Sequence, residues 1–227
     1  MTARPTTRQG PAARVDSLQD RLLTVADNAL KTLVGGLHPA RPLPRPAAAQ
    51  QAPDTPLDPQ QRELSGRLMR VNHVGEICAQ ALYQGQALVA RDPALHAHFR
   101  QAARDECDHL AWCSERLQQL DARPSLLDPL WYAGALALGA LAGAFGEKVS
   151  LGFVVETENQ VEQHLASHLQ RLPQADVASR AVVEQMKADE VEHALAAEKL
   201  GAIALPAPVR WGMRAAAKLM TGTAHWI

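Results

Sequence analysis

One short motif occurs twice in this chain, and it limits the folds that the chain can adopt. The two copies are residues 105–109 and 189–193, and both read Asp-Glu-x-(Asp or Glu)-His. Residues three positions apart on an α-helix lie on the same face, one turn from each other. Each copy therefore presents a carboxylate and an imidazole side by side, which is half of a metal site. The two pairs are Glu106 with His109 and Glu190 with His193.

A further glutamate precedes each copy at nearly the same distance. The spacing from Glu76 to Glu106 almost equals the spacing from Glu158 to Glu190. A helix of about 15–20 residues, a short turn and a returning helix would bring such positions to the same level. The sequence thus predicts two helical hairpins that offer four Glu and two His. Four-helix bundles that hold two iron or manganese ions use this ligand set. Charged solvent-facing helices are the alternative, but Ala, Leu and Val surround both copies and indicate inward-facing surfaces.

The six residues suggest how two metal ions would be shared. Glu106 and Glu190 would bridge both ions, and the other four residues would form two pairs of terminal ligands. The pairs are Glu76 with His109 and Glu158 with His193. Mixed carboxylate and imidazole donors favour iron or manganese over zinc. No catalytic residue is predicted beyond these metal ligands.

Each motif copy begins with an aspartate directly before the ligand glutamate. Asp105 and Asp189 are candidate acceptors for the imidazole N–H of the opposite histidine, which would fix its tautomer and orientation. His164 and His168 form an i,i+4 pair near the end of the same predicted helix as Glu158. We interpret His168 as a polar residue at a helix end, and His164 as a residue near the site that contacts ligands or substrate.

Changes in composition along the sequence divide the chain into four parts. Aromatic residues make up only 4% of the chain and hydrophobic residues 47%, chiefly Ala and Leu, which favours helices over sheet. Residues 1–15 are polar and contain no apolar run, so they are predicted to be a disordered N-terminus and not a secretory signal. Residues 16–37 predict an N-terminal helix, and residues 38–59 a Pro/Ala-rich linker that is extended and unable to form a core. Residues 60–227 predict the catalytic domain, an all-α four-helix bundle followed by a further helix over 206–222.

The most apolar stretch is residues 126–146, which carries no charge between Asp128 and Glu147. Its length is just within reach of a membrane-spanning helix. Because the next segment must carry Glu158 into the bundle, we expect the stretch to pack on the bundle and dip into one membrane leaflet. The amphipathic helices predicted over 16–37 and 206–222 fit a membrane surface or plain packing against the bundle.

Several segments together resemble the demethoxyubiquinone hydroxylase family. They cover about residues 60–220, in the family's order and at its spacing. They are Arg70-Val71-Asn72-His73-Val74-Gly75-Glu76, Tyr83-Gln84-Gly85-Gln86, Asp105-Glu106 with Asp108-His109, Arg123-Pro124, Pro129-Leu130-Trp131, residues 155–158 with His164, and Glu190 with His193. All six ligand positions of the family are filled, whereas the Pro-rich segment 38–59 has no secure match.

The resemblance implies a ferritin-like protein with two iron ions as its cofactor. It implies a monooxygenase of ubiquinone biosynthesis that uses O₂ to hydroxylate the ring of a polyprenyl methoxy-methyl-benzoquinol. The expected location is the cytoplasmic side of the cell membrane, as a peripheral protein on the lipid surface, with other ubiquinone-biosynthesis proteins as partners. The net charge of −1 gives no reason to expect a nucleic-acid partner.

Two other classes of function fit a helical bundle. An iron-storage or peroxide-scavenging protein would use the same six ligands, but it would not need the apolar stretch 126–146. A metal-free structural bundle would leave the inward-facing Glu and His side chains unexplained. The bundle alone does not decide among these classes, and the site and the apolar surface favour the hydroxylase.

Overall fold

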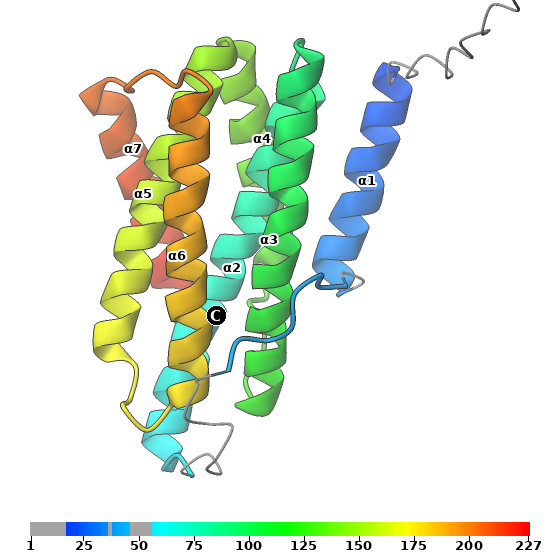
Figure 1. Cartoon of the computed structure of the whole chain (residues 1–227). Helices are drawn as coiled ribbons and strands as arrows, with labels where there is room; N and C mark the ends of the chain where they lie inside the picture. Colours follow the sequence, from blue (N-terminus) through cyan, green and yellow to red (C-terminus); the bar gives the residue numbers. More distant parts are fainter. Residues whose placement is uncertain (1–16, 36–37, 46–55) are drawn as a thin grey trace, which may run out of the picture.

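The computed structural model describes residues 17–35, 38–45 and 56–227, and this part of the chain contains only helices and loops (Figure 1). The helices are α1 (Leu18–Val34), α2 (Pro59–Val89), α3 (Pro93–Gln119), α4 (Asp128–Ala144), α5 (Glu147–Arg171), α6 (Val177–Lys199) and α7 (Ala207–Ala224). The arrangement confirms the expected all-α, ferritin-like bundle with additional helices at both ends. The predicted disordered N-terminus, residues 1–15, lies outside the described residues.

Local sequence signals set the helix ends close to the predicted positions. The Asp58 side chain caps α2 by accepting a hydrogen bond from the Gln61 backbone N–H. Pro59 occupies the first turn of α2, where its missing N–H leaves no helical hydrogen bond unmade. At the C-terminal end of α1, Gly35 adopts a φ of 84°, a left-handed conformation that favours glycine and ends the helix.

Two antiparallel hairpins form the four-helix bundle. α2 packs against α3 in one hairpin, and α5 packs against α6 in the other. Figure 1 shows that α4, which packs along α2, carries the chain from one end of the bundle back to the other. α3 and α5 therefore run in one direction, and α2 and α6 run in the opposite one. A crossover of this kind lets ferritin-like bundles place two hairpins side by side.

Apolar side chains fill the bundle above and below the level of the repeated motif. Each of two buried clusters takes residues from all four bundle helices. The largest members of one are Leu68, Met69, Trp112, Leu117, Leu165 and Met186, and those of the other are Tyr83, Leu95, Phe99, Leu151 and Val154. The motif residues lie between the two clusters, so the bundle offers them little contact with water.

α4 lies unusually close to α2 because two glycines face the opposite backbone. A Cβ atom on Gly85 would lie 2.2 Å from the Leu136 carbonyl oxygen, and one on Gly139 would lie 2.2 Å from the Leu82 carbonyl oxygen. The apolar stretch does not continue into the next helix, because Gly146 adopts a φ of 107° and turns the chain. The described residues therefore form two helices here, α4 and α5, and not one long helix.

Large apolar side chains remain exposed on several helices, among them α1, α4, α6 and α7. None of the described helices combines the length and the apolar character needed to cross a membrane. α1 and α4 pack against the same bundle helix, and their exposed large apolar side chains are Leu22, Leu23, Leu30, Leu33, Val34, Leu130, Leu138 and Leu141. On α7 they are Val209, Trp211 and Leu219.

The described part of the Pro/Ala-rich segment is not a free linker. Residues 38–45 form neither helix nor strand and bend at Ala40 and Arg41, and Leu43 packs against the apolar cluster that contains Trp112. The segment has no core of its own because it carries few apolar residues, and it uses the bundle's core instead. Residues 46–55 of the predicted linker lie outside the described residues.

Candidate metal centre

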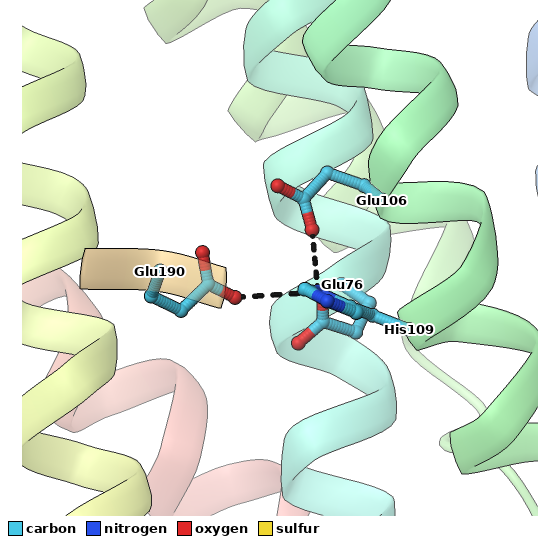
Figure 2. A group of neighbouring side chains, drawn as sticks. All are labelled: Glu76, Glu106, His109 and Glu190. Atoms are coloured by element: carbon cyan, nitrogen blue, oxygen red, sulfur yellow. Dashed lines mark ion pairs between the residues drawn. The ribbon is translucent and has the colours of Figure 1, made fainter. Parts of the chain in front are cut away.

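The structure brings together all six predicted ligands, from all four helices of the bundle. Their ligand atoms form two overlapping groups, and within each group all of them lie within 4.8 Å of one another. The first group is Glu76, Glu106, His109 and Glu190, and the second is Glu106, Glu158, Glu190 and His193. Figure 2 shows the first group, with Glu76 on α2, Glu106 and His109 on α3, and Glu190 on α6, all pointing toward one another.

Glu106 and Glu190 belong to both groups, as the predicted bridging role requires. His109 Nδ1 lies 2.9 Å from Glu106 Oε2 and 3.3 Å from Glu190 Oε1. His193 Nδ1 lies 3.0 Å from Glu106 Oε1 and 3.2 Å from Glu190 Oε2. Each of these carboxylates thus turns one oxygen to each histidine. Glu76 Oε2 lies 3.5 Å from His109 Nδ1, which matches the predicted terminal pair.

The site is a dense cluster of buried charge. Five of the six side chains are at most 2% exposed, and His193 is 18% exposed. Among the described residues, both Glu106 oxygens, Glu76 Oε2 and His109 Nδ1 are buried without a well-aligned hydrogen bond. Close approach of carboxylates with no aligned donor is costly in a protein interior.

The electrostatic consequence is a set of strongly shifted pKa values. Burial raises the pKa of Glu76 to about 8, although His109 opposes this shift. Burial, with the nearby charges of Glu190 and Glu106, raises the pKa of Glu158 well above its usual range. Burial opposes a charge on His193, but its close contacts with the Glu106 and Glu190 carboxylates outweigh this effect and raise its pKa to about 11. The metal-free site therefore retains protons that a cation would displace.

This donor set fits two divalent cations. Four carboxylates carry four negative charges, and two ferrous ions would neutralise them while occupying the unpaired oxygens and the two inward-facing Nδ1 atoms. Oxygen and imidazole donors of this kind suit iron and manganese. The outward-facing nitrogen of His109 supports the same interpretation, because Nε2 lies 2.8 Å from Asp189 Oδ2 and directs the proton away from the site.

The two motif aspartates differ. Asp189 contacts the opposite histidine, His109, as the sequence predicted for both copies. Asp105 instead accepts a hydrogen bond of 2.7 Å from Gln101 on its own helix. The described structure therefore supports an orienting role for Asp189 and gives no such contact between Asp105 and His193.

The sequence model of one protein family matches most of the chain, from residue 63 to residue 224. That family is described as ubiquinone biosynthesis protein COQ7. The chain belongs to the COQ7 family. Its similarity to curated COQ7 relatives extends over nearly the full length of both partners.

Three such relatives carry the name 3-demethoxyubiquinol 3-hydroxylase. The protein of Verminephrobacter eiseniae is 60% identical over 92% of this chain and 98% of its own. The protein of Polaromonas sp. is 59% identical over the same shares. The protein of Burkholderia cenocepacia is 56% identical over 92% of this chain and 99% of its own. The family resemblance inferred from the motifs is thereby confirmed.

Tyr83 is a site residue whose role the sequence analysis missed, although it lies within a COQ7-like motif. Its hydroxyl donates a hydrogen bond to Glu158 Oε1, and burial raises the Tyr83 pKa well above its usual range. Tyr83 therefore keeps its proton and orients the Glu158 carboxylate. A signal was present, because Tyr83 follows Glu76 by seven positions, which places both on one face of α2.

Arg41 was also missed, and no sequence signal marked it. It comes from the Pro/Ala-rich segment, which lies before the residues matched by the COQ7 family model. Its guanidinium pairs with Asp108 and Asp189, both members of the repeated motif. A contact between a loop arginine and two helices this distant in sequence is visible only in three dimensions.

Other polar residues near the motif lie outside the two groups. Glu156 forms an ion pair with Arg214, and Glu162 forms one with Lys187. The rings of His164 and His168 lie 4.0 Å apart between centroids, and burial lowers the pKa of His164 to about 4. Within the described residues, this pair joins no third ligand in a metal-binding group.

Metal binding at this site should strengthen as the pH rises. The pKa of Glu76 rises from 4.5 to about 8, and that of His193 from 6.5 to about 11. Groups with raised pKa stabilise the metal-free fold at low pH and lose that contribution as the pH rises, while bound metal competes with the same protons. We expect ferrous affinity, measured by anaerobic titration, to increase at least about tenfold per pH unit between pH 6 and 8. Glu76→Gln should flatten this slope, and an equally steep slope in that variant would contradict the assignment.

Proposed function

We propose that this chain is a di-iron monooxygenase that uses O₂ to hydroxylate the ring of a polyprenyl methoxy-methyl-benzoquinol in ubiquinone biosynthesis. The single observation that carries the proposal is the buried group of four carboxylates and two imidazoles, shared between two overlapping ligand sets. Relatives named 3-demethoxyubiquinol 3-hydroxylase, similar over nearly the whole chain, support the same reaction and substrate.

Two iron ions bound by these six residues would supply the reduction and activation of O₂. The chain's own residues supply the surroundings. The apolar clusters above and below the site exclude water, which protects a reactive centre from side reactions. Tyr83 holds its proton at the hydroxyl oxygen and orients Glu158, while Asp189 orients the imidazole of His109.

We propose that the quinol reaches the site along the wall formed by α2 and α5. A cavity of about 640 Å³ lies at the end of the bundle, beside Phe99, Phe145 and Gln86. Gln86 also lines a narrow pocket with Tyr83 and Glu158, so this side chain joins the cavity to the metal centre. Its Nε2 donates to the Ser150 backbone oxygen at 2.9 Å, while its buried Oε1 has no partner among the described residues. That oxygen is available to accept a hydrogen bond from a ring hydroxyl.

The exposed apolar surface of α1 and α4 supports a peripheral place on a membrane. Phe145, at the end of α4, is 70% exposed and also lines the cavity. A substrate with a long prenyl chain resides in the lipid phase, so a cavity that opens beside an apolar surface would receive it directly. We propose that this surface lies on the cytoplasmic side of the cell membrane.

Activity and iron content should be lost together when a bridging carboxylate is removed. We expect about two irons per chain in the anaerobically reconstituted protein, as the two overlapping ligand groups require, and quinol hydroxylation that consumes O₂. Glu190→Ala should lose both, whereas Glu192→Ala, which changes an exposed neighbour on α6, should retain both. Iron uptake and oxidation without hydroxylation of the quinol would instead favour the iron-storage or peroxide-scavenging alternative.

Removal of the free Gln86 oxygen should weaken substrate binding more than it slows the reaction. We expect Gln86→Leu to raise the KM for a short-chain quinol about fivefold to tenfold, since one buried hydrogen bond contributes about 1–1.5 kcal/mol. Ser150→Ala is the matched control, because it removes one partner of the Gln86 amide group and leaves Oε1 in place. An equal rise in KM in both variants would mean that Gln86 acts only through packing.

Membrane binding should depend on the apolar face of α4. Leu130 and Leu141 are both more than half exposed. We expect the double substitution to Glu to reduce co-flotation with anionic phospholipid vesicles severalfold, because charged side chains are costly in the lipid interior. Val191→Glu, on an exposed position of α6, serves as the control. Full co-flotation of the double variant would overturn the assignment of this face.

A further inference from the structure

Residues 38–45 cross the outer side of α3 toward α6, over the level of the metal centre (Figure 1). The backbone N–H of Ala40 donates to Asp108 Oδ1 at 2.6 Å, and Arg41 Nε donates to Asp108 Oδ2 at 2.7 Å. The Trp112 indole N–H donates to the Arg41 carbonyl oxygen at 3.3 Å, and the Arg41 guanidinium lies 4.8 Å from the centre of the Trp112 ring. Together these contacts define the conformation of the Arg41 side chain.

The guanidinium of Arg41 reaches a second carboxylate on another helix. Arg41 Nη2 lies 2.8 Å from Asp189 Oδ2 on α6. The same oxygen, Asp189 Oδ2, lies 2.8 Å from His109 Nε2 on α3. Arg41 is therefore connected to an inward-facing metal ligand through a single carboxylate oxygen.

The contact with Arg41 restricts the orientation of the Asp189 carboxylate. The Asp189 side chain is 13% exposed, and its Oδ1 accepts a hydrogen bond of 2.9 Å from Gln185 on its own helix. Its Oδ2 faces α3, where only Arg41 and His109 contact it among the described residues. The planar guanidinium binds Asp108 and Asp189 with different nitrogens and sets the position of both carboxylates at once. Asp189 is thereby kept as an acceptor for the His109 N–H, and the His109 lone pair stays directed at the site.

We propose that Arg41 is a positioning residue of the metal centre, and that residues 38–45 form part of the site by holding Asp189 against His109. Arg41 is absent from both ligand groups and from the lining of the substrate cavity, so its effect passes through Asp189. This inference rests on the proposed di-iron function.

The test compares ferrous affinity in full-length variants by anaerobic titration. We expect Arg41→Ala to weaken ferrous binding about tenfold or more, which is the usual cost of losing an outer-sphere partner. Arg41→Lys should recover part of the loss, because its ammonium group can pair with one of the two carboxylates. It cannot bind both at once with separate nitrogens, as the planar guanidinium does. Arg45→Ala, which removes a neighbouring charge from the same segment, should bind iron like the unaltered chain.

A double-mutant cycle separates positioning from general docking of the segment. Asp189→Asn alone should weaken ferrous binding, and adding Arg41→Ala should cause little further loss, because both changes break the same connection. Additive losses would overturn the proposal. It would also be overturned if Arg41→Ala lowered the melting temperature of the metal-free protein while ferrous affinity stayed unchanged. If the unaltered chain bound no iron, the proposed function would be overturned instead. Failure of the Arg41 proposal is thus distinguishable from failure of the proposed function.

Discussion

Four carboxylates forced together in an apolar interior are the constraint on which this structure depends. Glu76, Glu106, Glu158 and Glu190 come from four helices and converge between two apolar clusters. Their mutual repulsion and loss of hydration oppose burial, and only protons or cations at the same place can offset this. The two hairpins, the crossover helix α4 and the N-terminal segment can be understood as a scaffold. This scaffold holds the four carboxylates close together despite their repulsion.

The outer helix α4 contributes to this scaffold by packing closely against α2. α4 lies against α2 at a distance that only Gly85 and Gly139 permit, which fixes the helix that carries Glu76 and Tyr83. Rigid elements can position ligands more precisely than loops can. The outer helices α1 and α4 therefore have two roles. Their inner faces pack against the bundle, and their outer faces expose the apolar side chains that are proposed to contact the lipid.

The sequence predicted the fold and the convergence of the six site residues because both depend on local periodicity. The three-residue spacing of Glu106 and His109, and the hairpin distance back to Glu76, follow from helix geometry alone. Helix ends followed from capping residues such as Asp58. Tyr83 could have been found by extending the same face of α2 by two turns. Arg41 could not, because its partners lie on two helices far along the chain and no periodic pattern relates a Pro-rich segment to them.

The reach of Arg41 has a consequence for how the chain assembles. Its pairing with Asp189 closes a loop that begins before α2 and ends within α6, so nearly the whole bundle lies inside that loop. Contacts between such distant parts carry a large closure entropy and depend on α3 and α6 already being side by side. We therefore expect this segment, although it leaves the ribosome before any bundle helix, to complete its contacts late in folding. In the role proposed for Arg41, the full set of contacts that orient His109 would form only in a chain that has completed its fold, and the proposed metal centre would be incomplete until then.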